Sequence, residues 1–254
     1  MNSIPLFKSH YSLGKSILTL EKLGSSKEKE PKSIIDIVKN NKLSKVHLVE
    51  DNFSSFLEAY TNCKKADLEL IYGIRMTFCQ NMEDKNEESL KTNCKYIIFM
   101  KNGDGYKDLI KIYSKAACDG FYYEPRMDFK TLKNYWNVKN LLIAVPFYDS
   151  FLHRNSLTES NCLPDFSFCK PYFFEEDNDV IYDFIIKEKI KNYTDNGKNY
   201  DIIRTKSIYY ENKSDFLSYL TFRCINNRST LSKPNLDQLS SNNFCVESWK
   251  EQNK

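Results

Sequence analysis

The sequence predicts an α/β fold with a mainly parallel sheet or barrel. Short apolar runs alternate with amphipathic stretches four or five times along the 254 residues, which is typical of strand–helix–strand units. Two of these runs, residues 96–100 (YIIFM) and 141–145 (LLIAV), are continuous, as expected for strands buried on both faces. The length allows a sizeable core, and 17 Phe with 17 Tyr exclude a wholly disordered chain.

Capping motifs and periodicity predict the elements in chain order. Ser33 with Asp36 predicts a capping box for a helix that runs toward Asn40, and Ser55 with Glu58 predicts a second one. The remaining predictions are strands at 46–49, 68–73, 96–100, 141–145 and 202–203, helices at 109–117 (followed by Gly120 at C′), 181–190 and 215–225, and a loop at 81–92. No linker divides the chain, so we expect one domain over 1–254, with a core at about 3–225 and a turn-rich tail at 226–254.

Composition excludes several functional classes. No run of 18 apolar residues occurs, so we expect no membrane-spanning helix and no membrane partner. The opening residues lack the apolar block of a signal peptide, which predicts a cytoplasmic protein. A net charge of +3 is too balanced to predict nucleic-acid binding, and three histidines exclude a His-rich metal enzyme. The eight cysteines, none spaced as C-x-x-C, are expected to be reduced and mostly buried.

Several stretches share the pattern of one family. The most specific is residues 102–126 (NGDGYKDLIKIYSKAACDGFYYEPR), and residues 7–13 (FKSHYSL), 46–72 and 202–249 add to it. Together they resemble the polymerase and histidinol phosphatase (PHP) domain at the N-terminus of bacterial DNA polymerase III alpha subunits. The resemblance spans nearly the whole chain and implies a distorted parallel β/α barrel of the PHP type, without the polymerase part.

The resemblance also implies where a metal cluster would lie. Active members are metal-dependent phosphoesterases or 3′–5′ exonucleases that hold two or three ions with His and carboxylate ligands. The family's ligand positions fall here on Leu6, Lys8, Glu50, Asp51, Arg75, Phe147, Ser207 and Tyr209. Only Glu50 and Asp51 keep ligand chemistry, enough for at most one weakly held Mg²⁺ or Mn²⁺. Lys8 and Arg75 would repel a divalent ion, and we expect them to pair with Glu50 and Asp51.

These substitutions predict a degenerate site without catalytic residues or a cofactor. We therefore expect a replication-associated pseudoenzyme that acts as a structural or protein-interaction module. Its expected partners are replication proteins such as a polymerase core. The Lys- and Asn-rich composition suggests a phage or another compact AT-rich genome.

Three alternatives stay open. The chain could be one component of a split DNA polymerase III alpha, a nucleotidyltransferase, with a second chain supplying the polymerase part. It could instead keep residual phosphoesterase or 3′–5′ exonuclease activity through Glu50, Asp51 and His10. A third alternative is single-stranded DNA binding, because aromatic and basic side chains interleave as they do in stacking platforms. The candidates for this contact are Tyr106, Tyr122, Tyr123 and Arg126.

Overall fold

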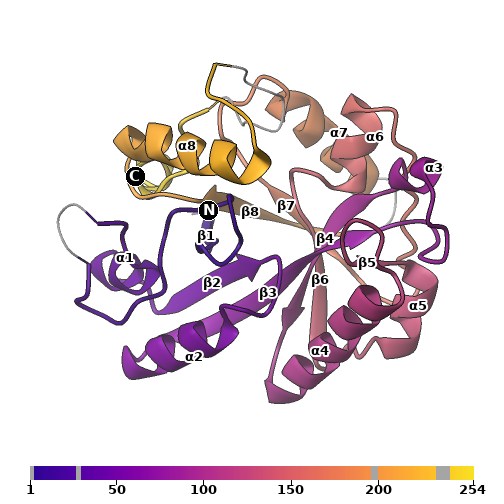
Figure 1. Ribbon diagram of the computed structural model, residues 1–254, viewed down its shortest axis with the longest axis horizontal. Helices are drawn as coiled ribbons and strands as arrows, with labels where there is room; N and C mark the ends of the chain where they lie inside the picture. The colour runs from indigo at the N-terminus through magenta and orange to yellow at the C-terminus, as the bar shows by residue number, and fades with distance from the viewer. Residues whose placement is uncertain (1–2, 27–29, 196–199, 233–240) are drawn as a thin grey trace. The chain divides into compact units, whose positions relative to one another are not determined.

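The computed structural model describes residues 3–26, 30–195, 200–232 and 241–254. The strands are β1 (Ile4–Phe7), β2 (Lys45–Glu50), β3 (Glu69–Phe78), β4 (Cys94–Met100), β5 (Arg126–Met127), β6 (Leu141–Val145), β7 (Tyr172–Glu175) and β8 (Asp201–Ile208). The helices are α1 (Ile34–Asn40), α2 (Phe56–Lys65), α3 (Glu87–Leu90), α4 (Gly103–Cys118), α5 (Phe129–Tyr135), α6 (Phe151–Leu157), α7 (Asp183–Asp195), α8 (Phe216–Asn227) and α9 (Val246–Gln252), with a 3₁₀ turn at Lys213–Asp215. Strands and helices thus alternate along the chain (Figure 1), as the sequence predicts.

Hydrogen bonding orders the strands β2-β1-β8-β7-β6-β4-β3-β5, and β2 also pairs with β3. Through that additional pairing the order of seven strands returns to its start, while β5 is added beside β3. This connectivity confirms the predicted fold class, an α/β protein of the β/α barrel type. The strand β4 departs from a purely parallel arrangement, because it is antiparallel to both β3 and β6.

The residues group into two compact units. The first comprises Met1–Tyr72, Glu176–Asp183 and Arg204–Lys254, and the second comprises Gly73–Glu175 and Phe184–Ile203. The strands β3 and β8 each run from one unit into the other. The expected single domain over the whole chain remains a prediction.

In the first unit, β1 pairs in parallel with both β2 and β8. Phe7 lies opposite Leu48, and Leu6 lies opposite Ser207. The apolar side chains Leu6, Phe7 and Leu48 are all buried. Since parallel neighbours end at the same edge of a sheet, the residues that follow β1 and β2 lie close together.

Both predicted capping boxes are wrong in detail, although both helices form. Ser33 caps α1 as expected, because its Oγ accepts from the amide of Ile35. Asp36 does not reach back to the cap; it accepts instead from the backbone amides of Gly24 and Ser26, at 2.7 and 3.2 Å. At α2, Ser55 makes no side-chain cap bond and its hydroxyl lies 3.0 Å from that of Tyr72. In both cases a tertiary partner has replaced the local one.

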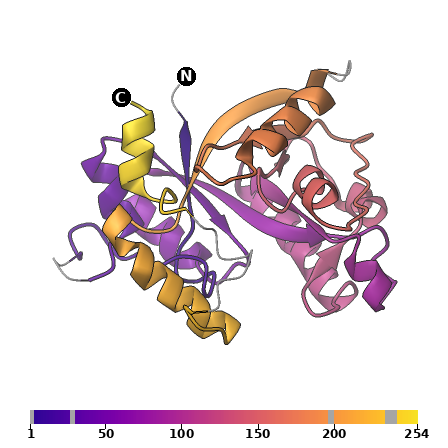
Figure 2. The same ribbon diagram turned by 90° about the horizontal axis from the view of Figure 1, so that it is seen from above.

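The C-terminal stretch is more ordered than the turn-rich tail that we expected. Its last part forms α9, which Figure 2 shows in yellow beside the start of β1. The indole of Trp249 donates to the carbonyl of Ser3 at 2.9 Å, and Cys245 is fully buried. Residues 233–240 of the predicted tail lie outside the described residues. Burial of Cys245 and its neighbours makes this stretch part of the core of the first unit.

The second unit has an aromatic core over β3 and β4. The strand predicted to end at Gly73 continues to Phe78, because Gly73 leaves room for the ring of Phe99. Phe78, Tyr96 and Phe129 are in mutual ring contact at centroid distances of 5.0 to 5.1 Å. The sequence patterns did not predict the short elements β1, β5, β7, α3, α5, α6 and α9, of which α3 lies in the expected loop at 81–92.

Among the residues that the structure describes, no helix has both the length and the apolar composition needed to cross a bilayer.

Candidate functional site

An ion pair occupies the place where β1 and β2 end. Lys8 directly follows β1 and Asp51 directly follows β2, and their Nζ and Oδ1 atoms lie 2.7 Å apart. The Lys8 side chain is 5% exposed and that of Asp51 is 30% exposed. Lys15 approaches the other carboxylate oxygen of Asp51 at 3.9 Å. The expected pairing of Lys8 with a neighbouring carboxylate is therefore present.

The carboxylate of Glu50 is buried beside this ion pair and is bound by serines. One oxygen accepts from the amide and hydroxyl of Ser9, at 3.0 and 2.5 Å, and the other accepts from the hydroxyl of Ser12. Burial raises the pKa of Glu50, while the Lys8 charge and the serine bonds oppose that rise. The sequence showed no role for Ser9 or Ser12, because the contact depends on how the 8–15 loop folds over β2.

A second buried carboxylate, Glu176, contacts Ser207, one of the ligand positions expected from the resemblance. The amide and hydroxyl of Ser207 donate to the two oxygens of Glu176, at 3.0 and 2.7 Å. Asn178 Nδ2 donates to the same carboxylate at 2.8 Å. In the sequence, Glu176 stands within the run of acidic residues 175–177, and nothing in that run indicates that its side chain is buried. It is Asp183 that accepts from the backbone before the helix, at the amides of Asn178 and Val180.

The other two positions of the first unit are apolar. Leu6 is buried in β1. Tyr209 is 8% exposed, and its ring stacks with those of Tyr219 and Phe244, at 5.7 and 5.5 Å between centroids. Its carbonyl accepts from the amide of Ile17 at 3.1 Å. At this expected ligand position the chain thus packs an aromatic ring.

Arg75 and Phe147 belong to the second unit. The guanidinium of Arg75 donates to the carbonyl of Tyr148 at 2.8 Å and to Asp149 Oδ2 at 3.0 Å. Phe147 is fully buried. Arg75 thus has a carboxylate partner within its own unit, and its expected pairing with Glu50 or Asp51 stays a prediction.

Over residues 3–26, 30–195, 200–232 and 241–254, no group of three or more His, Cys, Asp and Glu side chains is arranged to hold a metal ion. His10, the weak catalytic candidate, has its Nδ1 atom 3.3 Å from the carbonyl of Leu18 and its ring 4.5 Å from that of Tyr11.

The nucleic-acid candidates are only partly accessible. Arg126 is fully buried, and its guanidinium donates to Asp84 O, Ser89 Oγ and Gly120 O, at 2.8, 3.0 and 3.3 Å. This corrects its predicted role, because a fully buried guanidinium cannot reach a nucleic-acid strand. Tyr122 packs over the guanidinium, whose carbon lies 5.0 Å from the ring centroid. Tyr123 is 77% exposed, and Tyr106 is half-buried on α4.

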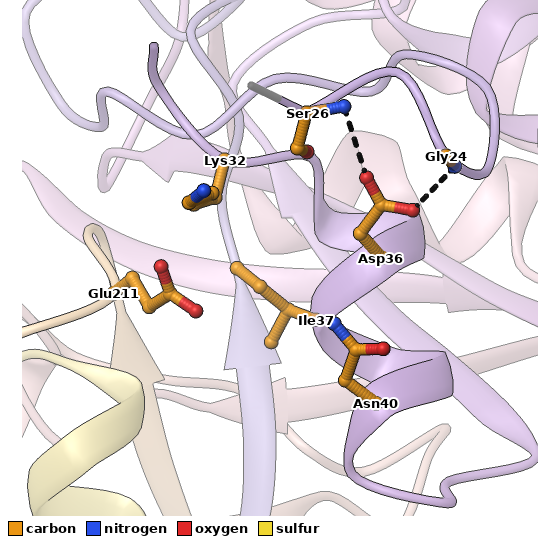
Figure 3. Close-up of a pocket in the computed structure, with 7 residues that line it drawn as sticks. All are labelled: Gly24, Ser26, Lys32, Asp36, Ile37, Asn40 and Glu211. Carbon is orange, nitrogen blue, oxygen red and sulfur yellow. Dashed lines mark hydrogen bonds between the residues drawn. The ribbon is translucent and has the colours of Figure 1, made fainter. Parts of the chain in front are cut away.

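A small polar pocket also lies in the first unit, away from these residues. Its volume is about 310 Å³, and Figure 3 shows Asp36 at one side, held by the amides of Gly24 and Ser26. Lys32 and Glu211 line it together with Ile37 and Asn40. None of the family's ligand positions takes part in it.

Comparison of the sequence with known protein families identifies the family of this chain. Residues 7–150, more than half of the chain, match the PHP domain. The chain belongs to the PHP domain family. This PHP domain is 24% identical over 234 residues to the DNA polymerase III subunit alpha of Borreliella burgdorferi, covering 86% of the chain and 20% of the relative.

Two further relatives match a shorter stretch. The DNA polymerase III alpha subunits of Helicobacter pylori strains 26695 and J99 are 31% and 30% identical over 84 residues, 33% of the chain and 7% of each relative. The PHP domain therefore spans at most a fifth of the length of these relatives. The family resemblance expected from the motifs is confirmed.

Proposed function

We propose that this PHP domain is a metal-independent structural or protein-interaction module that works with a DNA polymerase III-type enzyme in the cytoplasm. In this proposal it has no phosphoesterase activity of its own. The ammonium group of Lys8, 2.7 Å from Asp51, is the observation that carries the proposal.

The donor set does not fit a metal cluster. A divalent ion about 4 Å from the Lys8 ammonium would meet a repulsion of ~8 kcal/mol at an effective dielectric constant of ~20. Both oxygens of Glu50 already accept hydrogen bonds from serines, and both oxygens of Glu176 accept from Ser207. Lys8 thus supplies the positive charge that a metal ion would otherwise bring to Asp51.

Metal analysis tests this part of the proposal. After dialysis against Mn²⁺ or Zn²⁺ and removal of free ions, elemental analysis should find less than one ion per chain. Lys8→Gln, which removes the ammonium, should bind Mn²⁺ more strongly than the parent, whereas Lys107→Gln on the exposed face of α4 should not. Two or more tightly held ions in the parent protein would overturn the proposal.

The similarity to DNA polymerase III alpha subunits supports a polymerase partner. We expect the tagged chain to retain a DNA polymerase III alpha-type polypeptide from the same genome when the two are expressed together. Tyr123→Ala, at an exposed position of the second unit, tests whether this surface contacts the polymerase. If the two chains elute separately at micromolar concentration, the polymerase partner is excluded. Nucleotidyltransferase activity of such a complex would favour the alternative in which this chain is one component of a split polymerase.

Residual hydrolysis is the second candidate, favoured only by the adjacent carboxylates of Glu50 and Asp51. It predicts release of phosphate from p-nitrophenyl phosphate, or of nucleotides from a DNA 3′ end, with added Mn²⁺. Glu50→Gln should abolish such activity if Glu50 holds the ion. Activity that survives in Glu50→Gln would come from another site or a contaminant.

A further inference from the structure

Two buried cysteines of the second unit lie in a region that the proposed function does not use. Cys94 is the first residue of β4, and Cys162 lies in the segment between α6 and β7. Their exposed fractions are 5% and 1%. Although 68 residues separate them in sequence, backbone and ring contacts bring their segments together.

The contacts on either side of the pair fix this arrangement. Before it, the amide of Asn161 donates to the carbonyl of Lys91 at 3.1 Å. After it, the ring of Phe166 contacts that of Tyr96 edge-on, with centroids 5.9 Å apart. Residues 161–166 therefore run alongside residues 91–96, which brings Cys162 into the neighbourhood of Cys94. The two thiols are close enough to interact electrostatically, and each shifts the pKa of the other.

The backbone of Cys162 is held in this place by one side chain. Asn155 Oδ1 accepts from the amide of Cys162 at 2.8 Å, and Asn155 Nδ2 donates to its carbonyl at 2.9 Å. This two-point contact fixes the backbone of Cys162 in the segment that runs beside the start of β4.

The two thiols also differ in their readiness to ionise. Interaction with the Cys94 thiol lowers the pKa of Cys162, with a further contribution from the positive charge of Arg154. Burial raises the pKa of Cys94. By contrast, burial raises the pKa of Cys63 and of Cys169 to about 12. Because the thiolate is the reactive form, Cys162 is the better nucleophile of the pair.

We propose that Cys94 and Cys162 form an oxidation site, which a hydroperoxide converts into a disulfide that ties the segment before β7 to β4. The Cys162 thiolate attacks one peroxide oxygen, the O–O bond breaks, and a sulfenic acid forms while water leaves. Cys94 then attacks the sulfenic sulfur, the S–S bond forms, and the hydroxyl leaves as a second water. In total, two thiols lose two electrons and two protons, and hydrogen peroxide is reduced to two waters.

Peptide mapping of the full-length chain tests the site. The protein is treated with hydrogen peroxide, free thiols are alkylated under denaturing conditions, and the digest is analysed without reduction. We expect a cross-linked peptide pair containing Cys94 and Cys162, lighter by two hydrogen atoms than its reduced components and released by dithiothreitol. Cys169→Ser, in the same segment, should keep the cross-link, and Cys94→Ser should lose it. Oxidation of the exposed Cys118 is the internal control that the peroxide has reacted with the protein.

Two results would overturn the proposal. One is oxidised Cys118 together with Cys94 and Cys162 both recovered as alkylated thiols. The other is a dominant disulfide between a different pair. The parent protein alone decides between these outcomes, so the test does not depend on whether Cys94→Ser folds.

Discussion

At the scale of single residues, Lys8 brings a positive charge to the carboxylates of Glu50 and Asp51. Its ammonium lies against Asp51 and also lowers the pKa of the neighbouring carboxyl of Glu50. A long cationic side chain that is only 5% exposed needs such partners, because burying an isolated charge is costly. The ion pair between Lys8 and Asp51 thereby links the ends of β1 and β2.

Replacing Lys8 with methionine should destabilise the domain. Methionine keeps most of the apolar stem, but the half-buried carboxylate of Asp51 loses the ammonium group 2.7 Å away. We expect the free energy of unfolding, measured with urea, to fall by about 1–3 kcal/mol. Lys107→Met, on an exposed ion pair of α4, is the matched control and should change it by less than ~0.5 kcal/mol. Equal effects of the two substitutions would contradict this role of Lys8.

Glu50 should give the stability a pH dependence of known sign. Burial raises its pKa above the ordinary 4.5, so the folded protein holds the proton more tightly than the unfolded chain. Its contribution is most favourable below pH 4.5 and is lost as the pH rises through the folded-state pKa. Unfolding of Glu50→Gln and of the parent should therefore be compared across this range.

We expect the stability of Glu50→Gln relative to the parent to increase with pH. Glu87→Gln, on the exposed first turn of α3, is the matched control for the loss of a carboxylate. A relative stability that is flat or falls with pH would show that the serine bonds to Glu50 outweigh its burial.

At the scale of elements, the junction between α4 and β5 depends on close backbone approach. A Cβ atom on Gly120 would lie 2.0 Å from the carbonyl oxygen of Arg126. That residue is itself fixed by three hydrogen bonds from its buried guanidinium. From the sequence, Gly120 is expected at the C′ position after a helix. The structure adds a second reason for glycine, because there is no space for a Cβ atom beside the Arg126 carbonyl.

Gly120→Ala should be strongly destabilising, by about 3 kcal/mol or more, because backbone must move to relieve the clash. Gly103→Ala is the matched control at the start of the same helix, where a Cβ meets nothing within 4 Å. It should leave stability unchanged or raise it by up to ~1 kcal/mol. Thermal unfolding of both variants distinguishes the two sites. Similar midpoints for both would contradict the steric argument.

At the scale of the whole molecule, the chain passes between the two units four times. Two of these passages lie within β3 and β8, so unfolding either unit would break a strand that continues in the other. Shared strands favour cooperative unfolding, as expected for one domain.

The two tryptophans report on the units separately. Trp249 lies in the first unit and Trp136 in the second. Trp136→Phe and Trp249→Phe each keep a single indole. For each variant, we expect the urea midpoint from indole fluorescence to equal the urea midpoint from circular dichroism. Two separated transitions would show that the units unfold independently and that the chain is two domains.

The sequence alone determined much of this protein. Periodicity and apolar runs were sufficient for strands such as Leu141–Val145, which the structure reproduces residue for residue. Motif spacing identified the family, and the lost ligand positions predicted that Lys8 would pair with a carboxylate. These inferences succeed because they depend on residues near in sequence or on a pattern that spans the chain.

Only the tertiary structure decided which groups become partners across long separations. The contact of Glu176 with Ser207, the burial of Arg126 and the neighbouring thiols of Cys94 and Cys162 each join segments that no local pattern connects. Charge and polarity in the sequence favour solvent for Glu176 and Arg126. Burial reverses that preference once hydrogen-bond partners from distant segments replace water.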